Sequence, residues 1–358
     1  MNTFGKNVRI SLFGESHGPC IGITIDGLPA GLSLNLEKIN EALLRRQGMP
    51  EISTPRREKD EFQIVSGYFE NHTTGAPLTI QIPNQAFDSS PYEYGVIRPG
   101  HADYPLYKKY LGNHDYLGGG HASGRLTAPL VILGSICEKL LNQKGIFIAS
   151  RIKSIRHIQD KPLDYNQIDL DLLLNLKKSP FPVLDQRAQN LMLSAIKKAS
   201  AVGDSVGGTV QTFVFGCPVG LGEPFFDSVE SYLSHLMFAI PGVKAIEFGE
   251  GFAGTESLGS KQNDQMESHL GIVKFLSNHA GGINGGITNG NTIVFTVGVK
   301  PPSSIKKPQS TINVITDTNI TKQITGKHDP CIVHRVLPVV EALTAFAIYD
   351  LWLETQHG

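Results

Sequence analysis

A glycine-flanked turn near the N-terminus carries the histidine best placed to do acid–base chemistry. The turn Gly14-Glu15-Ser16-His17-Gly18 is echoed much later in the chain by Gly203-Asp204-Ser205-Val206-Gly207. Residues kept in both copies are expected to serve backbone geometry, whereas Val206 stands where His17 would recur. The plainer alternative is a loop histidine bonded to a backbone carbonyl, but the second copy indicates that the turn does not require an imidazole. His17 is therefore our first candidate for a catalytic group.

A second cluster of chemically active residues runs from Arg98 to Tyr104 with the sequence Arg-Pro-Gly-His-Ala-Asp-Tyr. Proline and glycine restrict this segment to a turn, so that Arg98 and His101 can face one anion. Asp103 can orient either the imidazole or a neighbouring arginine. A surface turn with a solvated histidine explains the same residues equally well, so this motif leaves both alternatives open.

A glycine run, Gly118-Gly119-Gly120-His121-Ala122-Ser123-Gly124-Arg125, precedes a long apolar segment that predicts a helix. Glycine lets backbone N–H groups approach a ligand, and the N-terminus of a helix favours negative charge. Ser123 can cap the helix or donate to a phosphate, and Arg125 adds a bidentate donor. The spacing matches neither the P-loop nor the dinucleotide-binding fingerprint. We favour an anion or cofactor cradle over a simple glycine hinge.

Other basic and glycine-rich segments could complete an anion-binding site. Gly326-Lys327-His328-Asp329-Pro330-Cys331 opens the last helix, and Lys300-Pro301-Pro302-Ser303-Ser304 follows a strand. Gly285 and its neighbours allow a flat ligand close to the backbone. Arg46 ends a helix, where it could simply complement the helix dipole. The charged stretch 51–60 is interpreted either as a solvated loop or as a mobile lid over an anionic substrate.

Hydrophobic periodicity and turn residues predict the elements that hold these motifs. Residues 36–47 are predicted to form an amphipathic helix capped by Asn35, and residues 126–144 a longer apolar helix. The segment 336–352 is apolar nearly all round, which predicts a helix buried on most sides. Strands rich in β-branched or aromatic residues are predicted at 8–13, 21–25, 78–82, 210–215 and 293–299.

The internal echo extends beyond one turn and predicts a duplicated α+β architecture. Gly27, Pro29, Gly31 and Leu32 correspond to Gly216, Pro218, Gly220 and Leu221, and the segment 74–82 resembles 289–297. We interpret residues 1–150 and about 195–358 as two versions of one unit, joined by a polar connector at 156–190. Helices are expected to pack between antiparallel sheets within a single domain, 1–358.

Composition narrows the class of protein further. The chain has 358 residues, of which 40% are hydrophobic, and a formal net charge of −1. Without a basic surplus, binding to nucleic acid or to an anionic membrane is not expected, and the N-terminal segment lacks a signal-peptide pattern. The four cysteines, at positions 20, 137, 217 and 331, are scattered, which is typical of reduced thiols. We predict a cytoplasmic enzyme without a bound metal, in which acid–base histidines act on a phosphorylated, polyanionic small molecule.

Taken together, six motifs resemble those of the chorismate synthase family. They are Gly-Glu-Ser-His-Gly at 14–18, Arg-Pro-Gly-His-Ala-Asp-Tyr at 98–104, Leu-Gly-Glu-Pro-Phe-Phe-Asp at 221–227, Ser-Asn-His-Ala-Gly-Gly-Ile at 277–283, Lys-Pro-Pro-Ser-Ser at 300–304 and Gly-Lys-His-Asp-Pro-Cys at 326–331. The resemblance runs in order from end to end of the chain. It implies a β-α-β sandwich with two pseudo-symmetric halves, a homotetramer, and the last step of the shikimate pathway.

The resemblance also implies a reaction and a role for each motif. The reaction is a lyase step in which 5-enolpyruvylshikimate 3-phosphate loses phosphate and a C6 proton by anti-1,4-elimination, giving chorismate with reduced FMN as cofactor. His17 would protonate the departing phosphate, His101 would act at N1 of the flavin, and Asp329 would orient the site, while flavin N5 would take the C6 proton. The substrate's anionic groups would be surrounded by Arg46, Arg98, Arg125 and Lys327. The residues expected to contact FMN are His121, Ala122, Ser123, Pro241, Gly242, Gly285, Lys300, Pro301, Pro302, Ser303, Ser304 and Lys327.

Several positions depart from the family's commoner pattern and leave alternatives open. Leu117 stands where an arginine is frequent, His121-Ala122 where Arg-Ser is frequent, and Ile52 near another frequent arginine. Lys327 also replaces an arginine, and it lacks the planar bidentate fork. One alternative is a non-catalytic flavin-binding protein of the same fold, and another is a different phosphometabolite lyase or transferase that needs no flavin. Since no dinucleotide fingerprint is visible, we expect an external flavin reductase rather than reduction by this chain with NADPH.

Overall fold

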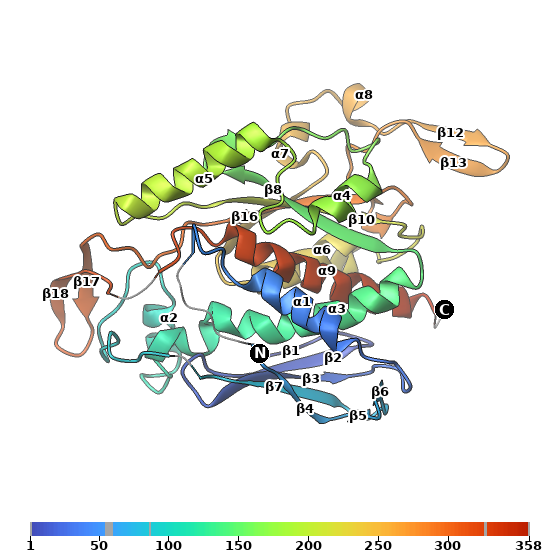
Figure 1. Cartoon of the computed structure of the whole chain (residues 1–358). Coiled ribbons are helices and arrows are strands. Elements are labelled where there is room, and N and C mark those ends of the chain that lie inside the picture. The colour runs from blue at the N-terminus through green and yellow to red at the C-terminus, as the bar shows by residue number, and fades with distance from the viewer. Residues whose placement is uncertain (1, 54–59, 86, 326–327, 357–358) are drawn as a thin grey trace. The chain divides into compact units, whose positions relative to one another are not determined.

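The computed structural model describes residues 2–53, 60–85, 87–325 and 328–356 (Figure 1). The chain divides into two compact units. The first unit comprises Met1–Leu133, Ala195–Val206 and Pro301–Ile332, and the second comprises Gly134–Ser194, Gly207–Lys300 and Val333–Gly358. The segment 301–332, which carries several of the predicted site residues, therefore packs with the N-terminal part of the chain.

An antiparallel sheet with the strand order β1-β2-β3-β7-β4 lies in the first unit. Its strands are β1 (Thr3–Phe4), β2 (Arg9–Gly14), β3 (Cys20–Asp26), β4 (Gln63–Ser66) and β7 (Leu78–Pro83). Alternate residues of the two central strands are at most 1% exposed, namely Ile21, Ile23 and Ile25 of β3 and Leu78, Ile80 and Ile82 of β7. The strands predicted at 8–13, 21–25 and 78–82 are confirmed, because side chains alternate between the two faces of a strand and one face here is the core.

Helix α1 (Leu36–Arg46) lies over one face of this sheet (Figure 1). The Asn35 side chain caps it by accepting a hydrogen bond from the backbone N–H of Lys38 at 3.0 Å. Ile39 and Leu43, on the same helical face, are each 2% exposed. The predicted helix 36–47 is therefore confirmed.

The glycine run leads into the next long helix through two short 3₁₀ turns, η1 (Leu117–Ala122) and η2 (Gly124–Leu126). Ser123 caps η2, because its hydroxyl accepts a hydrogen bond from the Arg125 N–H at 3.3 Å. Helix α3 (Thr127–Asn142) follows, one residue later than the predicted start at 126. The remaining described elements of this unit are α2 (Asp103–Lys109) and the strand pairs β5 (Tyr68–Phe69) with β6 (His72–Thr73) and β17 (Gln309–Asn313) with β18 (Thr318–Lys322).

A second antiparallel sheet, with the order β11-β16-β10-β8-β9, forms the centre of the second unit. Its strands are β8 (Phe147–Ile155), β9 (Ile158–Gln159), β10 (Gly208–Phe215), β11 (Val243–Phe248) and β16 (Ile293–Val299), which confirms the strands predicted at 210–215 and 293–299. Phe213 and Val214, which point to opposite faces of β10, are both fully buried. This sheet is therefore buried on both faces, which explains why its strands are continuous runs of apolar residues in the sequence.

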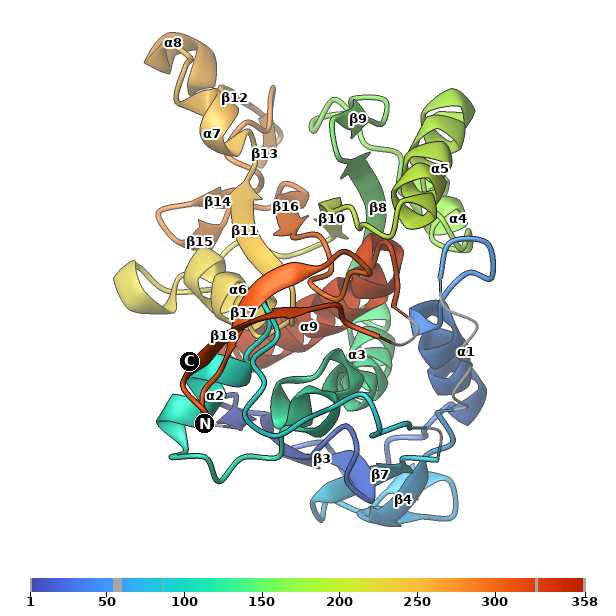
Figure 2. The ribbon, with the colours of Figure 1, turned by 90° about the vertical axis from the view of Figure 1, so that its left-hand side faces the viewer.

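The stretch predicted as a polar connector, residues 156–190, packs against one of the two faces of this sheet. It contains β9, helix α4 (Leu170–Leu176) and the start of α5 (Gln186–Ala201). Leu173 of α4 is 1% exposed and packs in a cluster with Phe213 and Val294. The other described elements of this unit are η3 (Phe225–Asp227), α6 (Val229–Phe238), α7 (Gly251–Gly254), α8 (Gly259–Gln262) and the strand pairs β12 (Met266–His269) with β13 (Ile272–Phe275) and β14 (Ile283–Asn284) with β15 (Ile287–Thr288). Figure 2 shows α7, α8 and the β12–β13 hairpin extending beyond the end of β11.

The last helix, α9 (Val333–Glu354), packs against β8, β10 and α6. By length and composition α9 could cross a membrane, but 89% of its most apolar window is buried inside the protein. Even its polar Glu341 is accommodated there, since the carboxylate accepts the Ser150 N–H at 2.9 Å and lies 3.6 Å from Lys177. Helix α9 is therefore a core helix, and the prediction of a helix buried on most sides is confirmed.

The duplication seen in the sequence recurs in the pairing register of the two sheets. Ile25 of β3 faces Leu78 of β7, and the positions that the sequence echo equates with them, Val214 of β10 and Ile293 of β16, face each other in the same way. In each of the Gly-x-Pro-x-Gly-Leu turns that follow β3 and β10, the final leucine is hydrogen-bonded to a buried threonine. Division of a single domain into two related halves stays a proposal, and the shared register supports it.

The two buried threonines make the same hydrogen bonds. Thr73 accepts the Leu32 N–H at 2.9 Å and donates to the Pro29 carbonyl at 2.6 Å. Thr288 accepts the Leu221 N–H at 2.9 Å and donates to the Pro218 carbonyl at 2.7 Å. Both threonines immediately precede the segments matched in the sequence, so the similarity of the two copies extends one residue further than the apolar pattern indicated.

Replacing either threonine with valine is expected to destabilise the protein by a similar amount. Thr73→Val and Thr288→Val keep the side-chain shape but leave a buried N–H and a buried carbonyl without their partner, which costs about 1–3 kcal/mol at each site. Urea denaturation of the two variants measures the loss. A variant with the stability of the natural protein would show that its hydroxyl does not hold the turn.

Candidate active site

His17 lies in the turn between β2 and β3, in the first unit, and is partly buried. Its Nδ1 atom is 2.9 Å from the Ser89 hydroxyl. The ring packs 5.0 Å from the Phe87 ring and meets the Tyr92 ring edge-on at 5.3 Å. Side chains therefore contact the imidazole both at Nδ1 and on the ring.

Asn84 ties the His17 turn to one of the predicted substrate-binding arginines. Its amide nitrogen donates to the carbonyls of Glu15 at 2.9 Å and Gly18 at 2.8 Å. Its amide oxygen accepts a hydrogen bond from Nε of Arg125 at 3.1 Å. One side chain just after β7 therefore sets the position of Arg125 relative to the turn that carries His17.

Asp60 joins Arg46 and Arg125 into one buried cluster. Its carboxylate accepts a hydrogen bond from Arg46 at 3.0 Å and another from Arg125, and the Asp60 side chain is only 2% exposed. Burial opposes ionisation of this carboxyl, but the two guanidinium groups outweigh it and hold the pKa of Asp60 below its usual value. Among the described residues, two arginines thus share the Asp60 carboxylate.

These contacts bear on two interpretations drawn from the sequence. Arg46 ends α1, but it is buried and paired with Asp60, so the helix dipole does not account for it. Asp60 belongs to the stretch 51–60 that was interpreted as a solvated loop or a lid, yet it lies in the core of the cluster. Residues 54–59 of that stretch lie outside the described residues.

The glycine run passes directly beside His17. Gly118, Gly119 and Gly120 have φ angles of 61°, 93° and 53°, a left-handed conformation that glycine adopts without strain. A Cβ atom on Gly118 would lie 2.3 Å from Cδ2 and Nε2 of His17. The Gly120 carbonyl accepts the Ser16 N–H at 3.2 Å. The run therefore needs glycine to approach the histidine, and it brings Ser123 and Arg125 to the same part of the first unit.

His101 is held by the segment that was predicted to bind cofactor. Its Nδ1 is 3.0 Å from the Pro99 carbonyl and its Nε2 is 2.7 Å from the Ser304 hydroxyl. Since a carbonyl only accepts, Nδ1 carries a proton and neutral His101 presents Nε2 as the acceptor. Ser303 donates to the Gly100 carbonyl at 2.8 Å, which joins the two segments a second time.

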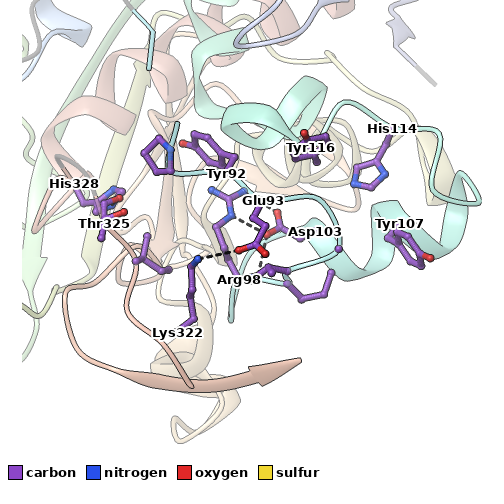
Figure 3. Close-up of a pocket in the computed structure, with 15 residues that line it drawn as sticks. Tyr92, Glu93, Arg98, Asp103, Tyr107, His114, Tyr116, Lys322, Thr325 and His328 are labelled. Carbon is purple, nitrogen blue, oxygen red and sulfur yellow. Dashed lines mark hydrogen bonds and ion pairs between the residues drawn. The ribbon is translucent and has the colours of Figure 1, made fainter. Parts of the chain in front are cut away.

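Arg98 and Asp103 form a bidentate ion pair next to His101. Nε and one terminal nitrogen of Arg98 each donate to the carboxylate at 2.7 Å, as Figure 3 shows, and the guanidinium lies 4.9 Å from the Tyr92 ring centre. Burial opposes both charges, but each group stabilises the other, so the pKa of Arg98 is raised and that of Asp103 is lowered. Of the alternatives for Asp103, the structure therefore favours orientation of the arginine.

A pocket opens beside this ion pair, between the segment 91–98 and the residues Lys322, Ile324, Thr325 and His328. Tyr107, His114 and Tyr116 line one side, and Lys322 and His328 line another (Figure 3). Burial, together with the nearby cations, lowers the pKa of His328 although the Thr325 carbonyl opposes the shift. The shift favours the neutral form of His328, and among the described residues of the lining Arg98 and Lys322 carry positive charge.

The remaining predicted site residues fall into three groups. His121, Ala122, Ser123, Pro301, Pro302 and Asp329 lie in the first unit with the histidines. Pro241, Gly242, Gly285 and Lys300 lie in the second unit, where the Lys300 N–H donates to the Gly242 carbonyl at 2.9 Å. Lys327 lies outside the described residues.

The residues of the first unit fit a flavin phosphate chemically. The Ser123 hydroxyl, which accepts the Arg125 N–H, can donate its own proton to an anion, and a Cβ atom on Gly124 would meet nothing within 4 Å. In the second unit, Gly285 is open in the same sense, with a φ of 61° and no atom within 4 Å of such a Cβ. Open glycine backbone and hydroxyl donors are what a flat, phosphorylated cofactor requires.

Three residues of this site were missed by reasoning from the sequence. Asn84, Ser89 and Tyr92 touch the predicted catalytic or binding residues through side chains. None stands in a glycine-rich motif, and each meets its partner across a long stretch of chain. A polar side chain directly after a buried strand, as with Asn84 after β7, was the one signal available.

The fold and the site define an α+β protein with a histidine beside a buried arginine–carboxylate cluster. The family model for chorismate synthase matches residues 8–353. The chain is 43% identical to a chorismate synthase of Dehalococcoides mccartyi, covering 98% of this chain and 96% of that protein, and 43% identical to one of Chitinophaga pinensis, covering 100% and 98%. A crystal structure of chorismate synthase matches 99% of this chain and 94% of the other, with a TM-score of 0.78 and 28% identity.

The chain belongs to the chorismate synthase family. It is therefore an enzyme, a lyase of aromatic biosynthesis, with a small-molecule substrate. The family also implies a flavin cofactor. The predicted family, enzyme class and α+β fold are thus confirmed.

Proposed function

We propose that the protein converts 5-enolpyruvylshikimate 3-phosphate to chorismate and phosphate by anti-1,4-elimination with reduced FMN, as the last step of the shikimate pathway. The observation that carries this proposal is the placement of His17 beside a cationic cluster. Asn84 bonds both the His17 turn and Arg125, and Asp60 bonds Arg125 and Arg46. An acid next to two arginines suits the departure of a phosphate.

Arg46, Arg98 and Arg125 would hold the anionic groups of the substrate. A guanidinium is a planar fork of N–H donors that suits a phosphate or a carboxylate, and each of these three is paired with a buried or partly buried carboxylate of the protein. Asp60 and Asp103 keep the planes of these guanidiniums in place before substrate binds, which lowers the entropy cost of binding.

His17 would give a proton to the phosphate oxygen as the C–O bond breaks. A general acid near neutral pH contributes most when its own pKa lies close to that pH, and histidine meets this condition. His101, fixed by Pro99 and Ser304, would hold the protonation state at the flavin, and Asp329 would orient that part of the site. Reduced FMN, when bound, would supply transient electron donation to the substrate and a base for the C6 proton.

The residues proposed to hold FMN are those whose backbone or hydroxyl groups suit it. In the first unit these are His121, Ala122, Ser123 and Pro301 to Ser304; in the second they are Pro241, Gly242, Gly285 and Lys300. Lys327 is proposed from its motif alone. We further propose a cytoplasmic homotetramer that receives reduced flavin from a separate reductase, since the chain has no dinucleotide-binding fingerprint.

An anaerobic assay tests the proposed function. The purified protein is supplied with 5-enolpyruvylshikimate 3-phosphate and FMN, reduced by dithionite in one arm and by NADPH alone in the other. We expect equal yields of phosphate and chorismate with dithionite and none with NADPH alone. Flavin binding without turnover in the dithionite arm would instead support a non-catalytic flavin-binding protein, and turnover without any flavin would support a different lyase.

A further inference from the structure

The segment from Phe87 to Tyr92 packs against the His17 ring. Phe87 packs at 5.0 Å between ring centres, Tyr92 meets the ring edge-on at 5.3 Å, and the Ser89 hydroxyl is 2.9 Å from Nδ1. Three side chains of one short segment thus contact the imidazole. The two aromatic rings restrict its tilt, and Ser89 contributes a directional hydrogen bond.

The opposite edge of the imidazole faces the glycine run. A Cβ atom on Gly118 would lie 2.3 Å from both Cδ2 and Nε2 of His17, so this edge of the ring lies against bare backbone. Nδ1 and Nε2 therefore have different surroundings, a hydroxyl on one side and the predicted anion cradle on the other. Only one of the two ring nitrogens is directed to where a phosphate is expected.

We propose that Ser89 is a positioning residue for His17, whose hydroxyl oxygen accepts the Nδ1 proton so that Nε2 is the atom that delivers a proton to the leaving phosphate. This inference rests on the proposed function. In the acid form both nitrogens carry protons, and Ser89 occupies the Nδ1 proton. After transfer, the neutral ring keeps its proton on Nδ1, so the same hydrogen bond is present before and after the step.

Several titratable and charged groups face this ring and need to stay constant in a test. The Asp88 carboxylate interacts with His17, and hydrogen bonds from Ser90 hold the pKa of Asp88 below its usual value. The Tyr92 phenol belongs to the ring that meets His17 edge-on, with the Arg98 guanidinium over it. Glu15 lies on the His17 turn itself. None of these groups is altered by a substitution at Ser89.

Kinetics of Ser89→Ala with reduced FMN give the first readout. Hydrogen bonds to charged groups contribute enough that we expect kcat to fall about 10-fold to 100-fold, with KM changed by less than about twofold. Ser89→Thr, which keeps the hydroxyl, is expected to recover most of the activity. Ser268→Ala is the matched control, because Ser268 is an exposed serine of β12 in the second unit and contacts none of the groups that face His17 among the contacts described.

Histidine nitrogen NMR gives a second readout that does not depend on turnover. In the natural protein, neutral His17 is expected to carry its proton on Nδ1. In Ser89→Ala the Nε2-protonated form should become populated, and the ring should lose its proton at lower pH because the acid form has lost an acceptor. The alkaline limb of the kcat profile should move to lower pH by the same amount.

The two readouts separate the outcomes. A lower kcat with an unchanged tautomer and unchanged pH profile would mean that Ser89 acts only on structure, which overturns the proposal. Full activity in Ser89→Ala would also overturn it. Absence of turnover in the natural protein would contradict the proposed function, while the NMR comparison would still decide whether Ser89 sets the protonated nitrogen of His17.

Discussion

Replacing His17 with alanine is expected to lower kcat by about 10²–10⁴-fold, the contribution of one positioned general acid. The physical reason is that the departing phosphate would have to leave without a proton from Nε2. Because Arg46 and Arg125 are held by Asp60 and Asn84 rather than by His17, substrate binding should be retained and KM should change little. The anaerobic assay with dithionite-reduced FMN measures both constants.

The fold should survive this substitution, since valine occupies the equivalent position of the second copy of the turn. The matched control is His72→Ala, which removes an exposed histidine whose ring bonds only a neighbouring turn carbonyl among the contacts described. It should keep the natural activity. A loss of less than about tenfold in His17→Ala would argue against its role as the acid.

Asp60→Asn is expected to reduce the free energy of unfolding by about 3–5 kcal/mol, because it removes the anion from a buried group of charges. The Asp60 side chain is 2% exposed, and the side chains of Arg46 and Arg125 are each 9% exposed, so water cannot replace the lost partner well. Asparagine has nearly the same size as aspartate, so the loss of unfolding free energy is attributed to the removed charge rather than to altered packing. Urea denaturation near neutral pH measures it.

The same substitution should change the response to acid. The folded-state pKa of Asp60 lies below the ordinary value of 3.8, so its stabilisation is complete above that pH and is lost as the pH falls through the folded pKa. The stability difference between the natural protein and Asp60→Asn should therefore shrink in that range. Glu41→Gln is the control, since the Lys38–Glu41 pair is 67% and 60% exposed and should leave stability nearly unchanged at any pH.

An Asp60→Asn variant as stable as the natural protein at neutral pH would contradict the role assigned to the buried cluster. If the variant is less stable but folded, its kinetics are informative as well. We expect KM to rise, since Arg46 and Arg125 would lose the carboxylate that holds their guanidinium planes. This response would differ from that of His17→Ala, in which kcat rather than KM carries the loss.

Local sequence patterns were sufficient to predict the helices and strands and to select His17 as the candidate acid. The alternation of Ile21, Ile23 and Ile25 and the cap at Asn35 each act over a few residues, and backbone preference and one-sided burial therefore predict them. The comparison of His17 with Val206 worked for a related reason. When a turn occurs twice in one chain, the residues present in both copies are attributed to backbone geometry. A residue present in only one copy is then a candidate for function.

Tertiary structure alone decided which side chains meet around that histidine. Asp60 bonds Arg125 across 65 positions and Ser89 bonds His17 across 72, so only the folding of the whole first unit brings these partners together. A hydrogen-bond partner is chosen by position in space, and no periodicity or cap encodes it. The sequence by itself determined the strands, the helices and the candidate acid, whereas the shared carboxylate of Asp60 and the hydroxyl at Nδ1 became visible only when the folding of the first unit brought distant segments together.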